Sequence, residues 1–286
     1  MEKLSRSFKH LSLLCSLPLT LLASGVNAEE AESFVYKAQN PLTPIYSVPL
    51  EYTYHGGAEN GGVSIGSVKP IIPVSFDGWN MINQLSLNFI GTNGVVNGIE
   101  QLPEPYPGTG VAGLGDTTLT SYFSPNLSDD FSIGFGPAFV FPTDTLIGDT
   151  EDRRSRELGS GKFSVGPAVM FVTQPRPWTL GLAVKQVWSV FGNNSRHGVS
   201  QMVLRPFVNY NLSDGWYLVS DMNMVANWNR SSAQTWTVPV GGGVGKLFMI
   251  GKNAINTKVE GYYNAMTPNL GPDWSANLTF QVLFAK

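Results

Sequence analysis

The last residues of the chain, DWSANLTFQVLFAK, alternate between apolar and polar side chains. The apolar positions share one parity: Trp274, Ala276, Leu278, Phe280, Val282 and Phe284. The intervening positions are polar and uncharged, and only Leu283 breaks the alternation. Because successive side chains of a strand point to opposite faces, this pattern predicts a strand with one apolar and one polar face.

The same alternation recurs about every 20 residues, and turn residues separate the segments. The clearest further segments are residues 130–142, 161–172, 178–190, 200–212, 215–228 and 254–263. These segments run about 10 residues or more, which is the length of a tilted membrane-crossing strand, whereas sandwich strands average about 5–6 residues. Large aromatic residues lie near both ends of the apolar faces, as Trp178 and Trp188 do, and membrane barrels carry such aromatic girdles. We therefore predict an all-β fold, a closed antiparallel transmembrane β-barrel, over the alternative of a soluble periplasmic β-sandwich.

The connections between these segments alternate in length. The long ones are residues 264–273, 227–234, 192–200, 142–160 and 91–113, and the short ones are MIGKN, NLSDG, TQPRP, SPNLSDD and SFDGWN. Outer-membrane barrels have short periplasmic turns and long outer loops. Counting back from the C-terminus predicts about 12 strands, an even number, beginning with VPLEYTYH and roughly GVSIGSVKPIIPV. Pro70 and Pro73 fit this second strand only if they lie near a strand end.

The N-terminus has the pattern of an export signal. Lys3, Arg6 and Lys9 precede the apolar run LSLLCSLPLTLLASGV, which is too short to span a bilayer comfortably, and Val26-Asn27-Ala28 fits a cleavage site after Ala28. We expect residues 1–28 to be a signal peptide, 29–47 a periplasmic N-terminal segment and 48–286 the barrel. Residues 29–47 could hang as a tail or fold inward as a plug. The predicted location is the bacterial outer membrane.

Composition excludes several classes. The net charge is −3, so no basic field attracts nucleic acid, and charged residues make up only 14% of the chain against about 25% in soluble domains. The only cysteine, Cys15, lies in the predicted signal peptide, so the mature chain has no disulfide and no cysteine-bound metal. We expect no cofactor and no metal site.

Short motifs along the chain resemble those of a known family. They include LGDTT at Leu114, LGSGK at Leu158, RPFVNYNL at Arg205, WTVPVGGGVGK at Trp236 and PDW at Pro272. Together with QNP, SVP, FSP, FPT, VGPA, PWTLG, VWSV and GWYL, they run from about residue 39 to the C-terminus. The chain resembles the outer-membrane family named after the meta-cleavage pathway of phenol degradation, whose members carry labels such as "transporter" or the misleading "neuromedin U". The resemblance implies an outer-membrane barrel that passes hydrophobic or aromatic compounds.

Five charged residues fall on the face opposite the predicted lipid face. They are Lys185, Arg205, Asp221, Lys258 and Glu260. A basic residue at the lipid midplane costs about 2–4 kcal/mol, so all five belong in the lumen. They could pair with one another and plug the barrel, or line a path for solutes. About 12 strands lie between the filled eight-strand barrel and the open porin, so barrel size does not decide between these.

Other motifs have simpler interpretations. His197 and His55 are the only histidines of the mature chain; no serine or carboxylate at period-two spacing completes a triad, which favours loop roles for both. GGGVGK at 241–246 lacks the Ser or Thr of a phosphate loop and lies in a strand context, where glycine relieves crowding. The charged loop GDTEDRRSREL reads as a solvated outer loop, with contact to lipopolysaccharide or a lid as the alternative.

The sequence thus predicts a non-enzymatic outer-membrane channel for passive uptake of small apolar or aromatic solutes. The five inward charges would set its selectivity. Two alternatives stay open: an outer-membrane lipid hydrolase with His197 as base, and a closed structural or adhesive barrel. Expected partners are outer-membrane lipid, lipopolysaccharide, the barrel-assembly machinery and a small solute, but no nucleic acid.

Overall fold

A computed structural model describes residues 28–59, 61–94, 96–102, 111–128, 130–147 and 158–284. Residues 1–27 of the predicted signal peptide and most of the charged loop GDTEDRRSREL lie outside these residues. The described part contains one long helix, α1 (Ala28–Gln39), and a single sheet. None of its helices is long and apolar enough to cross a membrane.

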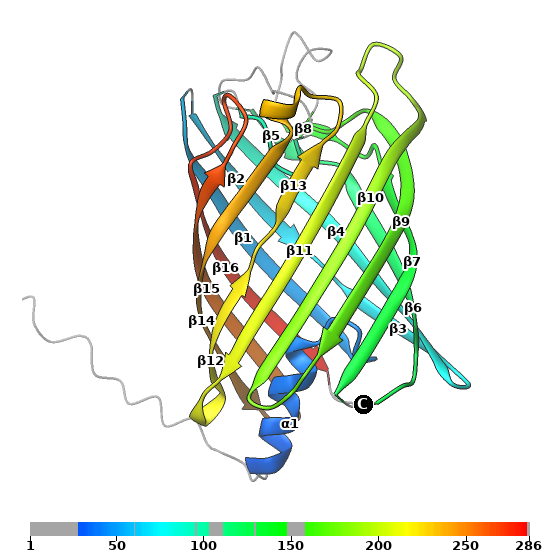
Figure 1. Ribbon diagram of the computed structural model, residues 1–286, viewed down its shortest axis with the longest axis vertical. Coiled ribbons are helices and arrows are strands. Elements are labelled where there is room, and N and C mark those ends of the chain that lie inside the picture. Colours follow the sequence, from blue (N-terminus) through cyan, green and yellow to red (C-terminus); the bar gives the residue numbers. More distant parts are fainter. Residues whose placement is uncertain are drawn as a thin grey trace, which may run out of the picture.

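The sheet closes on itself into an antiparallel barrel (Figure 1). Its wall has twelve positions, each occupied by one strand or by two shorter strands in line. The ring runs β1, β2, β4, β6, β7, β9, β10, β11, β12, β14, β15, β16 and back to β1. The seam pairs the first strand with the last, from Tyr46↔Phe284 to Gly56↔Trp274. The predicted fold class and strand number are confirmed. The strands are β1 (Tyr46–Ala58), β2 (Gly61–Val68), β3 (Ile71–Phe76), β4 (Trp79–Asn93), β5 (Val111–Leu114), β6 (Thr117–Pro125), β7 (Phe131–Phe141), β8 (Thr145–Ile147), β9 (Lys162–Thr173), β10 (Trp178–Gly192), β11 (Ser200–Asn211), β12 (Trp216–Asp221), β13 (Met224–Asn227), β14 (Trp236–Ile250), β15 (Asn253–Met266) and β16 (Trp274–Phe284).

Three wall positions consist of two strands in line: β2 with β3, β5 with β6, and β12 with β13. The first break falls at Lys69 and Pro70. Proline lacks the N–H that a ladder requires, which accounts for the interruption there. Pro73 stays inside β3, which pairs with β4 along its length but with β1 only at Ser47↔Ile71.

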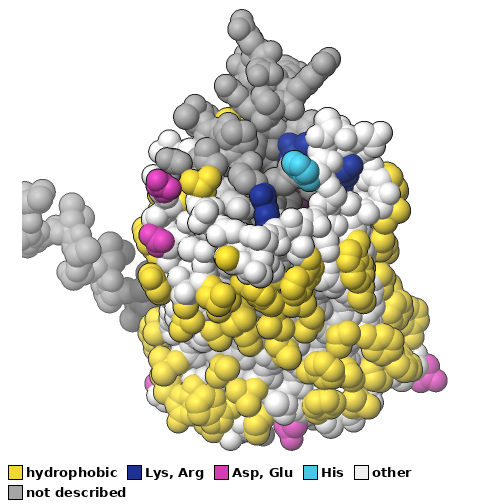
Figure 2. Space-filling model, turned by 45° about the horizontal axis from the view of Figure 1, so that its top comes forward, with side chains coloured by type: hydrophobic (Ala, Val, Ile, Leu, Met, Phe, Trp, Pro, Cys, Tyr) yellow, Lys and Arg dark blue, Asp and Glu magenta, His cyan; other side chains and the backbone are white. Residues whose placement is uncertain are grey.

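The apolar side chains that occupy alternate positions of each strand face the outer surface. In β16, Trp274, Leu278, Phe280 and Phe284 are exposed, while Ser275, Thr279 and Gln281 are buried inside. Figure 2 shows the hydrophobic side chains spread over the flank of the barrel and mostly polar or charged ones around the mouth. Aromatic pairs lie at both ends, with Trp178–Tyr210 at one and Trp228–Trp236 at the other. This surface matches the lipid-facing band of outer-membrane barrels.

The two ends of the barrel differ as the connection lengths predict. The five short connections and α1 lie at one end, here called the turn end, and the long connections lie at the other, the loop end (Figure 1). A turn such as Asp77-Gly78 needs only two residues, and Gly78 has the positive φ (73°) that such a turn favours.

The N-terminal segment folds into the turn end of the lumen. Phe34 and Val35 of α1 pack against Leu247, Ala254 and Leu283, which point inward from β14, β15 and β16. Leu283, the residue that breaks the alternation of the last strand, is therefore apolar because it meets the helix. Of the two placements that the sequence left open, the structure has the inward one, and the first strand begins at residue 46 rather than 48.

Polar contacts fix the end of this segment between the barrel walls. Gln39 donates through Nε2 to Asn211 Oδ1 (2.7 Å) and accepts from Thr179 Oγ1 (2.9 Å). The carbonyl of Pro41 accepts from Gln84 Nε2 (3.2 Å). These partners come from β4, β10 and β11, so the segment touches opposite sides of the wall.

At the loop end, residues 96–102 fold inward as well. Val96, Ile99 and Leu102 are buried in an apolar cluster with residues of β2, β4 and β5. The Asn97 amide donates to the carbonyl of Leu270, in the loop between β15 and β16 (3.2 Å). We call residues 96–102 the inner loop.

Candidate functional site

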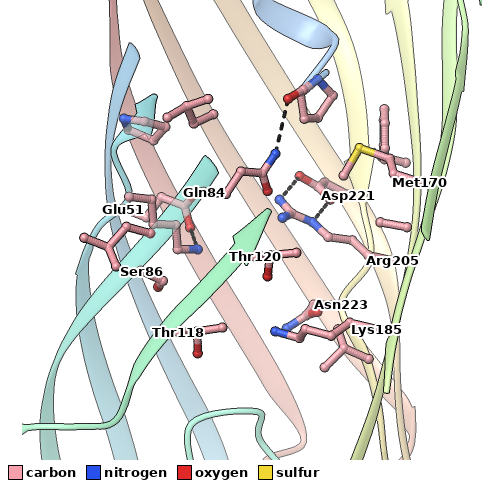
Figure 3. A pocket seen from close by; sticks show the side chains of 18 of the residues that line it. Glu51, Gln84, Ser86, Thr118, Thr120, Met170, Lys185, Arg205, Asp221 and Asn223 are labelled. Carbon is pink, nitrogen blue, oxygen red and sulfur yellow. Dashed lines mark hydrogen bonds and ion pairs between the residues drawn. The ribbon is translucent and has the colours of Figure 1, made fainter. Parts of the chain in front are cut away.

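A cavity of about 270 Å³ lies in the lumen between the N-terminal segment and the inner loop. Its walls come from strands all around the barrel and from residues 37–45 and 100–101 (Figure 3). Small-molecule pockets range over about 300–1,000 Å³, so this cavity lies just below that range.

One side of the cavity wall is apolar. The strands β6, β7, β9, β10 and β11 present a continuous cluster of buried side chains there, joined by residues from their neighbours. Those that line the cavity are Ile71, Tyr122, Val140, Met170, Ala183, Val187, Val199 and Phe207. Polar and charged inward residues were singled out from the sequence, but this apolar part of the lumen was not identified from it. The inward positions of these strands carry alanine, valine, methionine and aromatic residues together with polar ones such as Thr120, Lys185 and Arg205.

Two inward aromatic side chains are seated on glycines of the neighbouring strand. A Cβ on Gly181 would lie 2.0 Å from the Phe207 ring, and one on Gly245 would lie 2.1 Å from the Tyr217 ring. Each ring therefore occupies the space that a side chain on its partner would need. Gly245 belongs to the GGGVGK stretch, whose predicted role as relief of crowding in a strand agrees with this contact.

A network of charges adjoins this apolar cluster and comes from β11, β12 and β15. Arg205 donates to Asp221 through two parallel bonds, Nε to Oδ1 (2.6 Å) and Nη2 to Oδ2 (2.7 Å). Lys258 lies 3.2 Å from Asp221 Oδ2 and 3.0 Å from Glu260 Oε2. Tyr262 completes the group, because its hydroxyl donates to Glu260 Oε1 (2.7 Å) and accepts from the Asp221 amide (2.7 Å). Bidentate pairing of this kind holds a guanidinium in a fixed orientation.

A second ion pair ties the inner loop to the wall. Lys185 Nζ donates to Glu100 Oε1 (2.6 Å), and Asn223 Nδ2 donates to the other carboxylate oxygen (3.1 Å). Burial alone would raise the pKa of Glu100, but the charge and the hydrogen bond of Lys185 outweigh it and lower that pKa to about 2. Glu100 is therefore ionised at neutral pH, and Lys185 holds the inner loop in place.

A third pair, Lys69 with Glu51, lies at the break between β2 and β3. The eight charges of these pairs balance as four cations and four anions: Lys69, Lys185, Arg205 and Lys258 against Glu51, Glu100, Asp221 and Glu260. The cavity wall thus has no net charge from these groups.

The five residues singled out from the sequence all point into the barrel. Lys185, Arg205, Asp221 and Lys258 line the cavity, and Glu260 is buried behind Lys258, next to Tyr262. The structure brings four of them into one network and places Lys185 apart, on β10, where it pairs with Glu100 of the inner loop.

Sequence reasoning missed Glu51, Lys69 and Glu100. Glu51 has the inward parity of β1 and could have been found by the same alternation. Lys69 lies in a strand break and Glu100 in a long connection, where no periodicity signals which way a side chain points.

The histidine singled out from the sequence lies outside this cavity. His197 is exposed in the loop between β10 and β11, three residues before Ser200 at the start of β11. Among the described residues no group of three or more His, Cys, Asp or Glu side chains could hold a metal ion.

The hydrogen-bonded ladder of the wall is interrupted beside the cavity where β14 meets β12 and β13. β14 pairs with β12 through Val219↔Gly243 and with β13 from Val225↔Thr237, so its residues 238–242 have no ladder partner on that side. One side-chain bond bridges the gap, from Ser220 Oγ to the carbonyl of Gly241 (2.7 Å). Asn223, which bonds the inner loop, lies in this break.

Comparison with known proteins supports the fold. The chain is similar to the crystal structure of an outer membrane channel from Pseudomonas putida F1, with 15% identity, a TM-score of 0.59, and coverage of 84% of this chain and 96% of that one. Lower similarity is found to the NanC porin (11% identity, TM-score 0.48, 84% and 100% coverage) and to the CymD monoaromatic hydrocarbon channel (8%, 0.40, 86% and 91%). No protein-family model and no curated protein matches the sequence. The fold is therefore that of bacterial outer-membrane barrels.

Proposed function

We propose that this chain is an outer-membrane channel for the passive uptake of small apolar or aromatic solutes, and not an enzyme. The observation that carries the proposal is the cavity of about 270 Å³ with an apolar side, kept inside a barrel whose two ends are occupied by inward-folded segments. A barrel with a purely structural role fills its interior with side chains, as eight-strand barrels do. An apolar inner surface beside an unfilled space is useful to a solute that leaves water readily.

The paired charges of the lumen support an apolar or aromatic solute over a small inorganic ion. These side chains are paired in the structure and their charges cancel. They therefore do not create an excess of positive or negative charge that would attract hydrated ions. Pairing also keeps them satisfied while an apolar solute displaces water next to them.

The proposal has solutes reach the cavity by one of two routes. One passes the inner loop, which Glu100 holds in place. The other passes the interruption between β12, β13 and β14, where the wall lacks ladder bonds over residues 238–242. An apolar solute dissolved in the membrane would reach the second route without crossing the mouth.

The wider setting follows from the same proposal. The protein would be exported, cleaved after Ala28, inserted by the barrel-assembly machinery and surrounded by outer-membrane lipid and lipopolysaccharide. Membership of the phenol meta-cleavage family of outer-membrane proteins stays a prediction from the motifs. The similar structure from Pseudomonas putida F1 is described as a channel, which agrees with this assignment of function.

Uptake by intact cells tests the proposal, because lipopolysaccharide rather than the bilayer itself limits entry of such solutes. Cells of a Gram-negative strain without other channels for aromatic compounds would receive radiolabelled toluene at micromolar concentration. The proposal expects a faster initial rate with the barrel than without it. Equal rates, with the barrel folded and inserted, would leave the closed structural barrel as the better reading.

A further inference from the structure

The lumen charges are balanced in number but not in accessibility. The side chain of Arg205 is 42% exposed and that of its partner Asp221 is 13% exposed. The same inequality holds for Lys69 over Glu51 (28% and 13%) and for Lys258 over Glu260 (13% and 1%). Only the pair on the inner loop is reversed, with Lys185 at 16% and Glu100 at 22%. Cationic groups therefore form most of the charged surface that a solute meets.

Arg205 also has donors to spare. A guanidinium carries five N–H donors, and the pairing with Asp221 engages only Nε and Nη2. Nη1 makes no hydrogen bond within the described residues. Asp221 fixes the plane of the guanidinium, so its remaining donors are held in position rather than free to rotate away.

The apolar side of the same cavity complements this group. Tyr122, Met170 and Phe207 belong to the apolar cluster and line the cavity together with Arg205. Figure 3 shows Met170 and Arg205. A solute with one aromatic ring would place the ring against these side chains and a planar anionic group toward Arg205. A carboxylate has the flat, two-oxygen geometry that a guanidinium edge binds best.

We propose that the cavity holds a single-ring aromatic carboxylate, with Arg205 as the group that selects the anion. This inference rests on the proposed function, since it names the solute class of the same cavity. The electroneutral wall then gains one negative charge from the solute, against the more exposed cations. Uncharged aromatic solutes fit the apolar side but leave the Arg205 edge unused.

Equilibrium dialysis of radiolabelled benzoate and benzamide against the folded full barrel in phosphatidylcholine nanodiscs tests the proposal. The two probes share a shape and differ in charge. The wild-type protein is expected to bind benzoate at least tenfold more tightly than benzamide, because hydrogen bonds to a charged group contribute about 1.5–3 kcal/mol and 1.4 kcal/mol is tenfold. Arg205→Gln with Asp221→Asn, which removes the pair without stranding a charge, should lose this preference. Asp221→Asn alone releases two further donors and should tighten benzoate binding.

The control is Lys252→Gln, which removes a positive charge from the exposed turn between β14 and β15 and should leave the preference intact. A heat-dependent shift in gel mobility confirms that each variant is folded. The inference is overturned if wild type binds benzamide as tightly as benzoate, or if the double variant keeps the preference. If wild type binds benzamide as tightly as benzoate, the proposed function still stands. If it binds neither probe, the result counts against both the proposed function and this inference.

Discussion

Replacing Glu100 by Gln should open the inner loop toward the cavity. The change removes the carboxylate that pairs with Lys185 at 2.6 Å and leaves that lysine, mostly buried, without its counter-charge. The pKa of Glu100 falls from 4.5 to about 2, and at about 1.4 kcal/mol per unit this corresponds to roughly 3 kcal/mol of attraction in the closed state. The apolar cluster of Val96, Ile99 and Leu102 is untouched, so the loop still has a closed form to return to. A loss of about 3 kcal/mol raises the open population by about a hundredfold.

Cysteine labelling measures that population. The predicted mature chain contains no cysteine, and Thr118 points into the cavity (Figure 3), so Thr118→Cys places a single thiol below the inner loop. A membrane-impermeant thiosulfonate added to intact cells should label this thiol up to a hundredfold faster when Glu100 is Gln. Glu59→Gln, at an exposed position at the end of the β1–β2 connection, is the matched control and should not change the rate. An unchanged rate in the Glu100 variant, or an equal increase in the control, would refute the assignment of the ion pair as the fastening of the loop.

Three further outcomes follow from the same geometry. The ion pair stabilises the closed loop above pH 4.5, the ordinary pKa of Glu100, and this contribution is lost as the pH falls toward about 2; the labelling rate of the cavity thiol, divided at each pH by that of a free thiol in solution because the thiolate is the reacting form, should therefore be constant from pH 5 to 8 and rise only in acid, and a rise of this ratio near pH 6 would contradict it. Gly245→Ala puts a Cβ about 2.1 Å from the Tyr217 ring and should lower stability by about 1–3 kcal/mol, read as a lower temperature for loss of the folded gel band, whereas Gly261→Ala meets nothing within 4 Å and should change it little. Leu283→Ala removes the contact of β16 with α1, costs about 2–3 kcal/mol of docking, and should make residues 28–45 susceptible to protease from the turn end, while resistance like that of wild type would argue against the inward placement.

Period-two alternation predicted most of the fold because lipid imposes it. Every residue that faces hydrocarbon must be apolar, and the rule acts on each strand independently of what the lumen contains. The last strand shows this clearly, since its lipid-facing set from Trp274 to Phe284 is exposed as expected. Chain closure then follows, because an open sheet edge cannot be satisfied in lipid.

No such uniform rule applies to residues that face the lumen, so the sequence alone could not predict how their side chains are arranged. Inward positions mix apolar and charged residues on the same strands, as Arg205 and Phe207 do on β11, so neither Met170 nor Phe207 stands out from its strand. From the sequence, pairing of Arg205 with Asp221 was one of two possibilities, the other being separate charges along a solute path. The alternation of side chains shows that both residues face inward, but it does not show whether they contact each other. Glu100 reaches the cavity from a loop, and loops carry no periodicity to reveal it. Leu283 could be recognised in the sequence as an exception to the alternation. The reason for its apolar side chain is its contact with α1, a helix that is distant in sequence.

The central claim is that solutes pass through the cavity, and blocking that cavity tests it most directly. Ala183 lines the cavity on β10, and Ala183→Phe should fill much of it without touching the lipid face. Ala276→Phe adds the same ring to an exposed position on β16 and serves as the matched control. Initial toluene uptake by intact cells should fall to the rate of cells without the barrel for the first variant and stay at the wild-type rate for the second. Uptake at the wild-type rate by a folded Ala183→Phe barrel would contradict the account.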